Sequence, residues 1–210
     1  MRQGYSHGMG ELKHCETPIH ILLGGGIGSG KSAAGRRFEG LGAMVVEADR
    51  VGHAVLEPGG EAFGPVGERW PSVIADGFID RTALAEIVFA DPEQLRALEA
   101  LTHPPIIRRI SEIASSEDDL VVEIPLVLEM PGDWTRVFVD AANGTRVRRA
   151  VERGGSESAV NARMMSQPKH DEWLAWADHQ INNDGSIEDF EKQIDALWQG
   201  LKTTHCGLQV

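Results

Sequence analysis

The sequence predicts an α/β fold in which helices cover both faces of a parallel sheet. Short apolar runs alternate with helical patterns along the chain, and a glycine-rich segment joins the first run to a helical pattern. Several runs are apolar throughout, which is typical of strands buried on both faces of a parallel sheet. The expected strands cover residues 19–23, 43–46, 120–124 and 136–139.

The first expected helix follows the glycine-rich segment and runs from about Lys31 to Phe38. Residues 41–43 (LGA) then return the chain to the sheet. The first strand, this helix and the second strand therefore form a βαβ unit.

A second expected helix begins at Asp91 and Pro92, an N-cap residue followed by a first-turn proline. We expect it to end near His103, because Pro104 and Pro105 disfavour helix in the residues before them.

A long helix near the C-terminus is expected to pack on the rest of the fold without chemistry of its own. Ser186 followed by Asp189 gives its capping signal. Apolar residues at helical spacing mark one face: Ile187, Phe190, Ile194, Leu197, Trp198 and Leu201.

Length and charge indicate one globular, acidic domain. The chain has 210 residues and a formal net charge of −12, which argues against a general nucleic-acid or anionic-membrane partner. Residues 1–18 lack the apolar centre of a signal peptide, so we expect a flexible N-terminal extension before a single domain over 19–210. Cys15 and Cys206 lack metal-ligand spacing and are interpreted as free thiols of a cytoplasmic protein.

The glycine-rich segment fits the spacing G-x-x-x-x-G-K-[ST], known as the P-loop. Its glycines free backbone N–H groups to surround phosphate oxygens, and the following helix directs its positive N-terminus at the same site. Lys31 is expected to reach the β- and γ-phosphates of ATP, and the Ser32 hydroxyl to ligate Mg²⁺. The alternative is a glycine-rich turn followed by a chance Lys-Ser pair. The expected nucleotide-binding residues are Gly25, Gly26, Ile27, Gly28, Ser29, Gly30, Lys31 and Ser32.

Carboxylates follow the second expected strand in residues 45–50 (VVEADR), which place Glu47 and Asp49 at the ligand-facing end of the sheet. Asp49 there has two functional interpretations, accepting the proton of a substrate hydroxyl or holding Mg²⁺ through water. An acidic helix cap is an equally good interpretation of Asp49 alone.

Further segments, in chain order, resemble the successive signatures of dephospho-coenzyme A kinases. The resemblance runs from about residue 19 to 200. It rests on GGIGSGKS, EAD, EPGGEAF (57–63), DGFIDRTALAEIVF (76–89), LEALTHPPI (98–106), VVEIPLVLE (121–129) and ADHQINNDGS (177–186).

This resemblance implies a three-layer P-loop kinase fold with a helical acceptor-binding region at about 55–118 and a lid at about 145–176. It implies MgATP-dependent phosphorylation of the ribose 3′-hydroxyl of dephospho-CoA, the final step of coenzyme A biosynthesis. Dephospho-CoA would then be the small-molecule partner.

Carried over position by position, the resemblance makes Asp49 the catalytic carboxylate and assigns Arg81 and His103 to the acceptor substrate. Read without it, Arg81 is a surface charge and His103 a helix C-cap. Asn183 matches an asparagine near the nucleotide base. Pro125 is expected to shape the floor of the crevice.

Glu123, beside Pro125, has two open interpretations, namely a contact to Mg²⁺ or substrate through water, and a buried structural carboxylate.

Arginines of residues 145–153 (TRVRRAVER) share a helix face, because Arg146, Arg149 and Arg153 are three and four positions apart. Arg149 and Arg153 match the family's lid arginines, and we expect Arg149 to neutralise charge on the transferred phosphoryl group. The alternative is a solvated basic helix.

Some positions depart from the family pattern: Ala33 replaces the usual threonine, Glu47 an aspartate, Trp173 an arginine and Asn182 an aspartate. Indole cannot neutralise phosphate, and we interpret Trp173 and Trp176 as packing residues, with stacking on adenine as the alternative. A second hypothesis therefore stays open. In it the chain is a nucleotide-binding member of the family with a lost or altered acceptor, acting as a sensor or regulator or as a kinase for another metabolite.

Overall fold

A computed structural model describes residues 17–116 and 118–207, with side chains to residue 204. It confirms the α/β fold. All the strands of its five-stranded sheet run parallel, in the order β2-β5-β1-β6-β7. Most of the expected N-terminal extension, including Cys15, and the side chain of Cys206 lie outside the described residues. The strands are β1 (His20–Gly24), β2 (Met44–Glu47), β5 (Leu120–Glu123), β6 (Thr135–Asp140) and β7 (His179–Asn182).

Strand β7 was not among the expected strands. It lies at the sheet edge, and only Ile181 of its residues is buried. A strand with only one apolar residue lacks the continuous apolar run by which the other strands were predicted.

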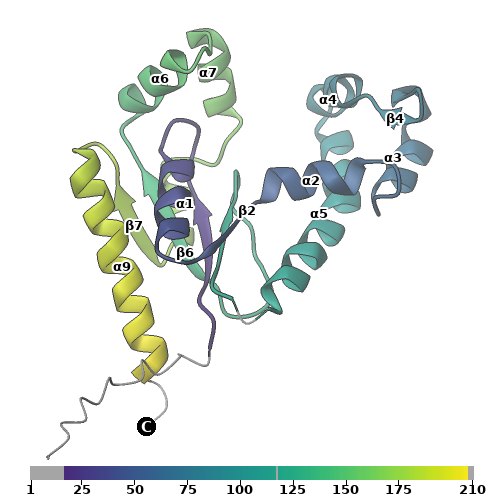
Figure 1. The fold of residues 1–210 in the computed structure, drawn as a ribbon. Coiled ribbons are helices and arrows are strands. Elements are labelled where there is room, and N and C mark those ends of the chain that lie inside the picture. Colours follow the sequence, from purple (N-terminus) through teal and green to yellow (C-terminus); the bar gives the residue numbers. More distant parts are fainter. Residues whose placement is uncertain (1–16, 117, 208–210) are drawn as a thin grey trace, which may run out of the picture.

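Helices cover the sheet on both faces (Figure 1). On one face, α1 (Lys31–Gly40) and α9 (Ile187–Gly207) pack Phe38 and Phe190 against Ile21 of β1. On the other face, Ile110 and Trp173 pack around Leu22 of the same strand. Alternate residues of β1 thus pack into two separate cores, which explains why this strand is apolar throughout.

The α9 cap is confirmed, because the backbone N–H of Asp189 donates to the Ser186 hydroxyl at 3.1 Å. The expected apolar face is confirmed at Phe190, Ile194 and Trp198, which are buried. Ile187 does not belong to that face, since it is 60% exposed. It is the first residue of α9.

A helical region follows β2 and has a core of its own (Figure 1). The chain runs through α2 (Ala48–Leu56), α3 (Phe63–Arg69), the 3₁₀ turn Pro71–Val73, the hairpin β3 (Ile74–Ala75) and β4 (Phe78–Ile79), α4 (Arg81–Ala90) and α5 (Pro92–Ala114). Its core contains Val55, Ala62, Val66, Trp70, Val73, Ile79, Leu84 and Val88.

The predicted end of the second helix near His103 is wrong, although its start is confirmed by the Asp91 cap on Glu93. Helix α5 continues through Pro104 and Pro105 to Ala114. An interior proline costs a helix about 3 kcal/mol. Packing offsets that cost, because the first half of α5 contacts the core of the helical region and the second half places Ile110 in the sheet core.

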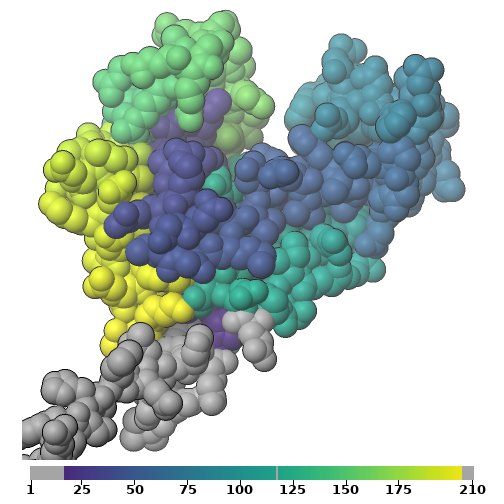
Figure 2. All heavy atoms as spheres, in the orientation of Figure 1, coloured from purple at the N-terminus to yellow at the C-terminus, as the bar shows by residue number. Residues whose placement is uncertain are grey.

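Three further helices lie between β6 and β7: α6 (Asn143–Glu152), α7 (Glu157–Met165) and α8 (His170–Trp176). Figure 1 shows α6 and α7 above the loop that joins β1 to α1. In Figure 2 the helix pair and the region containing α2–α5 stand apart on the same side of the molecule, with a notch between them.

Candidate active site

Strand register brings predicted site residues together at the carboxyl end of the sheet. Glu47 and Leu23 are both level with Glu123, and Gly24 is level with Phe138. In a parallel sheet these carboxyl ends face the ligand crevice. Asp49 lies two residues beyond β2, in the first turn of α2, and no side chain caps that helix.

The loop between β1 and α1 has a backbone that specific glycines permit. Gly28 and Gly30 have φ values of +77° and +107°, in the left-handed region that favours glycine. A Cβ at Gly30 would lie 2.1 Å from Nδ2 of Asn183, and one at Gly28 would lie 2.2 Å from the carbonyl oxygen of Arg146. The loop is therefore closely packed against Asn183, which follows β7, and against Arg146 of α6.

Lys31 and Ser32 begin α1 beneath this loop. The Lys31 amine donates to the carbonyl of Gly25 at 2.6 Å, and the Ser32 hydroxyl donates to Oε2 of Glu123 at 2.9 Å. Burial lowers the pKa of Lys31, and the nearby carboxylates of Glu123 and Asp49 oppose that shift. Burial likewise raises the pKa of Glu123, against its hydrogen bond from Ser32 and the charge of Lys31.

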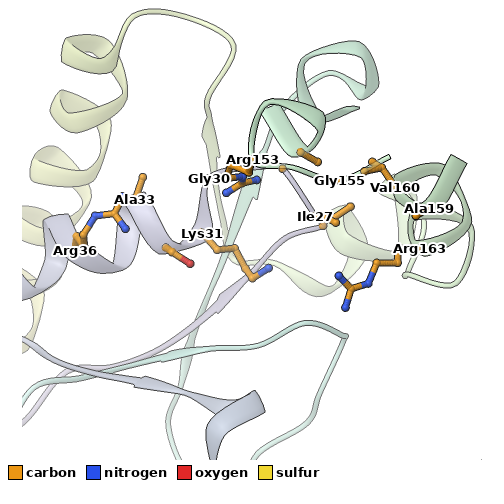
Figure 3. Close-up of a pocket in the computed structure, with 14 residues that line it drawn as sticks. Ile27, Gly30, Lys31, Ala33, Arg36, Arg153, Gly155, Ala159, Val160 and Arg163 are labelled. Carbon is orange, nitrogen blue, oxygen red and sulfur yellow. The ribbon is translucent and has the colours of Figure 1, made fainter. Parts of the chain in front are cut away.

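A cavity of about 470 Å³ opens between this loop, α1 and the helices α6 and α7. We call it the P-loop cavity. Four cationic side chains line it and, among the described residues, no carboxylate does. Figure 3 shows these cations coming from different elements around the loop. They are Lys31, Arg36, Arg153 and Arg163.

Two side chains from the segment between β6 and β7 hold the loop. Oε1 of Gln167 accepts from the backbone N–H of Ile27 at 2.8 Å, and Nε of Arg146 donates to the Ile27 carbonyl at 3.0 Å. Both backbone polar groups of Ile27 are thus hydrogen-bonded to side chains that are distant in the sequence.

Arg149 lies beside the loop, next to Asn183. Its Nη2 donates to Oδ1 of Asn183 at 3.5 Å, and its buried Nη1 has no hydrogen-bond partner within the described protein. Nδ2 of Asn183 in turn donates to the carbonyl of Ser29 at 2.7 Å. Asn183, predicted near a nucleotide base, here contacts the P-loop backbone.

A second cavity, of about 400 Å³, lies between α2, α5 and the segment after β5. We call it the α2–α5 cavity. Asp49, His103 and Pro125 line it together, along with apolar residues that include Phe89 and Ile106.

Arg81 lines an adjoining cavity of about 520 Å³, not the α2–α5 cavity itself. The two cavities share His53 and Leu56. A smaller cavity containing Glu47 and Glu123 shares Ser32 and Arg36 with the P-loop cavity.

A family model for dephospho-CoA kinase matches residues 19–189. The chain belongs to the dephospho-CoA kinase family. It is 40% identical over 194 residues to the dephospho-CoA kinase of Leifsonia xyli subsp. xyli, covering 87% of this chain and 98% of that protein. It is 37% identical to the enzyme of that name from Corynebacterium jeikeium, covering 87% and 100%.

A solved structure has a similar fold. The crystal structure of TT1252 from Thermus thermophilus is similar, with a TM-score of 0.74 and 34% identity over 88% of this chain and 98% of that one.

Of the described residues, none forms a helix long and apolar enough to cross a membrane.

The Trp173 departure from the dephospho-CoA kinase pattern is a packing feature. Trp173 and Trp176 are 2% and 4% exposed, which confirms their interpretation as packing residues. The indole N–H of Trp176 donates to the carbonyl of Leu128 at 3.2 Å. A Cβ at Gly24 would lie 2.3 Å from the Trp173 ring, so β1 approaches this indole closely where the loop begins.

Sequence reasoning missed several residues that line or hold the candidate site. Arg36 lies one turn after Ser32 on α1, and His53 one turn after Asp49 on α2, so helical spacing alone gave a signal for both. Arg163 and Gln167 gave no such signal, because only the packing of α6 on α7 brings that segment to the loop.

Proposed function

We propose that this member of the family transfers the γ-phosphoryl group of ATP to the ribose 3′-hydroxyl of dephospho-CoA, completing coenzyme A biosynthesis. One observation carries the proposal. The cation-lined P-loop cavity shares Ser32 and Arg36 with the cavity at the carboxyl end of the sheet that Glu47 and Glu123 line. Asp49, in the first turn of α2, lines the α2–α5 cavity.

The P-loop cavity suits a triphosphate. A protein with a formal charge of −12 gathers four cations there, and the N-terminus of α1 adds its own partial positive charge. Arg149, with an unpartnered buried nitrogen, is the candidate for stabilising charge on the transferring phosphoryl group.

The residues at the start of α1 fit Mg²⁺. The Ser32 hydroxyl and the Glu123 carboxylate supply oxygen atoms, the ligand type that this cation prefers. In the described part of the chain, no three or more His, Cys, Asp or Glu are grouped so as to hold a metal ion. An ion held chiefly by phosphates needs only one or two protein side chains. When bound, Mg²⁺ would neutralise phosphate charge during transfer.

Asp49 is the proposed proton acceptor for the attacking 3′-hydroxyl. It shares the α2–α5 cavity with His103, and the apolar lining of that cavity suits the non-phosphate part of an elongated acceptor. Arg81, in the adjoining cavity, is the proposed contact to the anionic part of that acceptor.

The alternative of a non-catalytic nucleotide-binding protein gains no support from Trp173. That residue is a core residue, and Arg153 and Arg163 supply cations to the P-loop cavity from the lid side. We further propose a cytoplasmic location, since the two cysteines show no disulfide or metal-site spacing.

A coupled assay of ADP formation with MgATP tests this function. ADP production that requires dephospho-CoA is expected. CoA, whose 3′ position already bears phosphate, is the matched control and should give none. ATP binding without transfer would support the alternative, whereas no ATP binding at all would contradict the P-loop assignment itself.

A further inference from the structure

Gly35 lies buried in the interior of α1, a position where glycine weakens a helix relative to alanine. The structure gives a reason for it. A Cβ at Gly35 would lie 2.4 Å from Oε1 and 3.3 Å from Cδ of Glu123. Such a separation is far inside van der Waals contact. An alanine and the present position of the Glu123 carboxylate are therefore incompatible.

The other oxygen of the same carboxylate holds Ser32. Oε2 of Glu123 accepts the Ser32 hydroxyl at 2.9 Å. Ser32 and Gly35 are three positions apart on α1, so they lie on the same side of the helix. The carboxylate thus fits between them, with one oxygen against the bare Cα of Gly35 and the other on the hydroxyl.

We propose that Gly35 is a positioning residue for the magnesium site, because its missing side chain opens the slot through which Glu123 reaches Ser32. This inference rests on the proposed function, in which Mg²⁺ arrives with ATP. A hydroxyl and a carboxylate held together would supply oxygens, directly or through water, to a bound Mg²⁺. The carboxylate is the far end of a flexible side chain. An added methyl group therefore displaces Glu123 and leaves α1 folded.

Gly35→Ala tests the proposal, with Gly200→Ala as its matched control. Gly200 is also a helical glycine, but it is exposed on α9, and a Cβ there would meet no atom of the described residues within 4 Å. We expect both variants to unfold at urea concentrations no lower than the wild type, measured without metal or nucleotide, since alanine favours helix.

Calorimetric titration of ATP in EDTA and in excess Mg²⁺ then separates the variants. ATP affinity in EDTA should be the same for the wild type and both variants. In Mg²⁺, Gly35→Ala should lose about tenfold in affinity, the usual size of effect when a residue that orients a metal ligand is changed, and Gly200→Ala should lose nothing.

Glu123→Gln provides the second variant. It should show the same loss in Mg²⁺, and the double variant with Gly35→Ala should lose no more than either single one, because both act through one carboxylate. Additive losses, an unchanged Mg²⁺ effect in Gly35→Ala, or a Gly35→Ala protein less stable than the wild type would each overturn the proposal. A wild type that binds ATP without any Mg²⁺ effect would overturn it too, and absence of all ATP binding would overturn the proposed function with it.

Discussion

The indole of Trp173 stacks on the ring of Phe138, with ring centroids 5.7 Å apart and ring planes within 8° of parallel. Phe138 is level with Gly24, the last residue of β1, so the stack lies directly under the start of the P-loop. Trp176 packs edge-on against the same indole. The position at which the family pattern has an arginine therefore supports the loop from the sheet core.

Trp173→Arg should destabilise the protein and should not increase phosphoryl transfer. The change removes the stack and buries a guanidinium among apolar rings, so we expect a loss of at least about 3 kcal/mol in the free energy of unfolding. Denaturant titration measures this loss, with Trp173→Phe as a milder control that keeps a ring. Faster transfer at unchanged stability would show instead that the site lacks a cation.

Asp49→Asn should lower kcat by about two to four orders of magnitude, the usual contribution of a positioned general base. Because Asp49 lines the α2–α5 cavity and not the P-loop cavity, ATP affinity should stay close to that of the wild type. Steady-state kinetics and ATP calorimetry measure the two quantities. Turnover that survives the change would exclude Asp49 as the base.

Lys31→Ala should weaken ATP binding and phosphoryl transfer together, because the amine lies in the P-loop cavity and stays close to the phosphates in ground and transition states. Loss of the hydrogen bond to the Gly25 carbonyl also loosens the loop. Calorimetry with ATP checks the first effect. Unaltered ATP affinity would argue against a phosphate-binding role.

Arg149→Ala should reduce kcat more than ATP affinity, since an arginine acting on developing phosphoryl charge contributes mainly in the transition state. Arg148→Ala is the matched control, because Arg148 is an exposed neighbour on the same helix that pairs loosely with Glu152 at 3.9 Å. Equal kinetic effects of the two variants would favour the solvated basic helix as the interpretation of this segment.

His170, the first residue of α8, should make the free energy of unfolding weakly dependent on pH. Its Nε2 lies 3.0 Å from Oδ2 of Asp140, a hydrogen bond that raises the pKa of His170 with help from Asp171. A raised folded pKa means that the contact stabilises fully below the pKa of an unfolded histidine, about 6.5. The contribution disappears as pH rises through the higher folded value.

The measurement is the difference in the free energy of unfolding between wild type and His170→Gln at about pH 5.5 and about pH 8.5, below and well above the pKa of an unfolded histidine. The histidine is half-exposed, so the difference should stay below about 1 kcal/mol and appear only at the lower pH. His179→Gln, which leaves this contact intact, is the control. A difference that grows with rising pH would contradict the assignment.

Features encoded in adjacent residues were predictable from the sequence. Each of these features depends on residues close together in the chain. They are the helix caps at Asp91 and Ser186, the P-loop at residues 25–32 and the continuous burial of β1. The positions of Asp49 and Glu47 near the carboxyl edge followed from the strand that precedes them. Local hydrogen bonding and side-chain periodicity suffice to specify such features.

Contacts between distant segments were decided by the tertiary structure alone. Helix α5 passes through Pro104 and Pro105 because its two halves pack on different cores. Gln167 reaches a loop N–H 140 positions earlier in the chain, and the carboxylate of Glu123 occupies the place of a missing Cβ on α1. The sequence by itself determined four of the five strands of the parallel sheet, the P-loop at residues 25–32 and the family of this protein. Only the folded chain decided which side chains hold that loop, because close packing between segments far apart in the chain leaves no periodic signature along it.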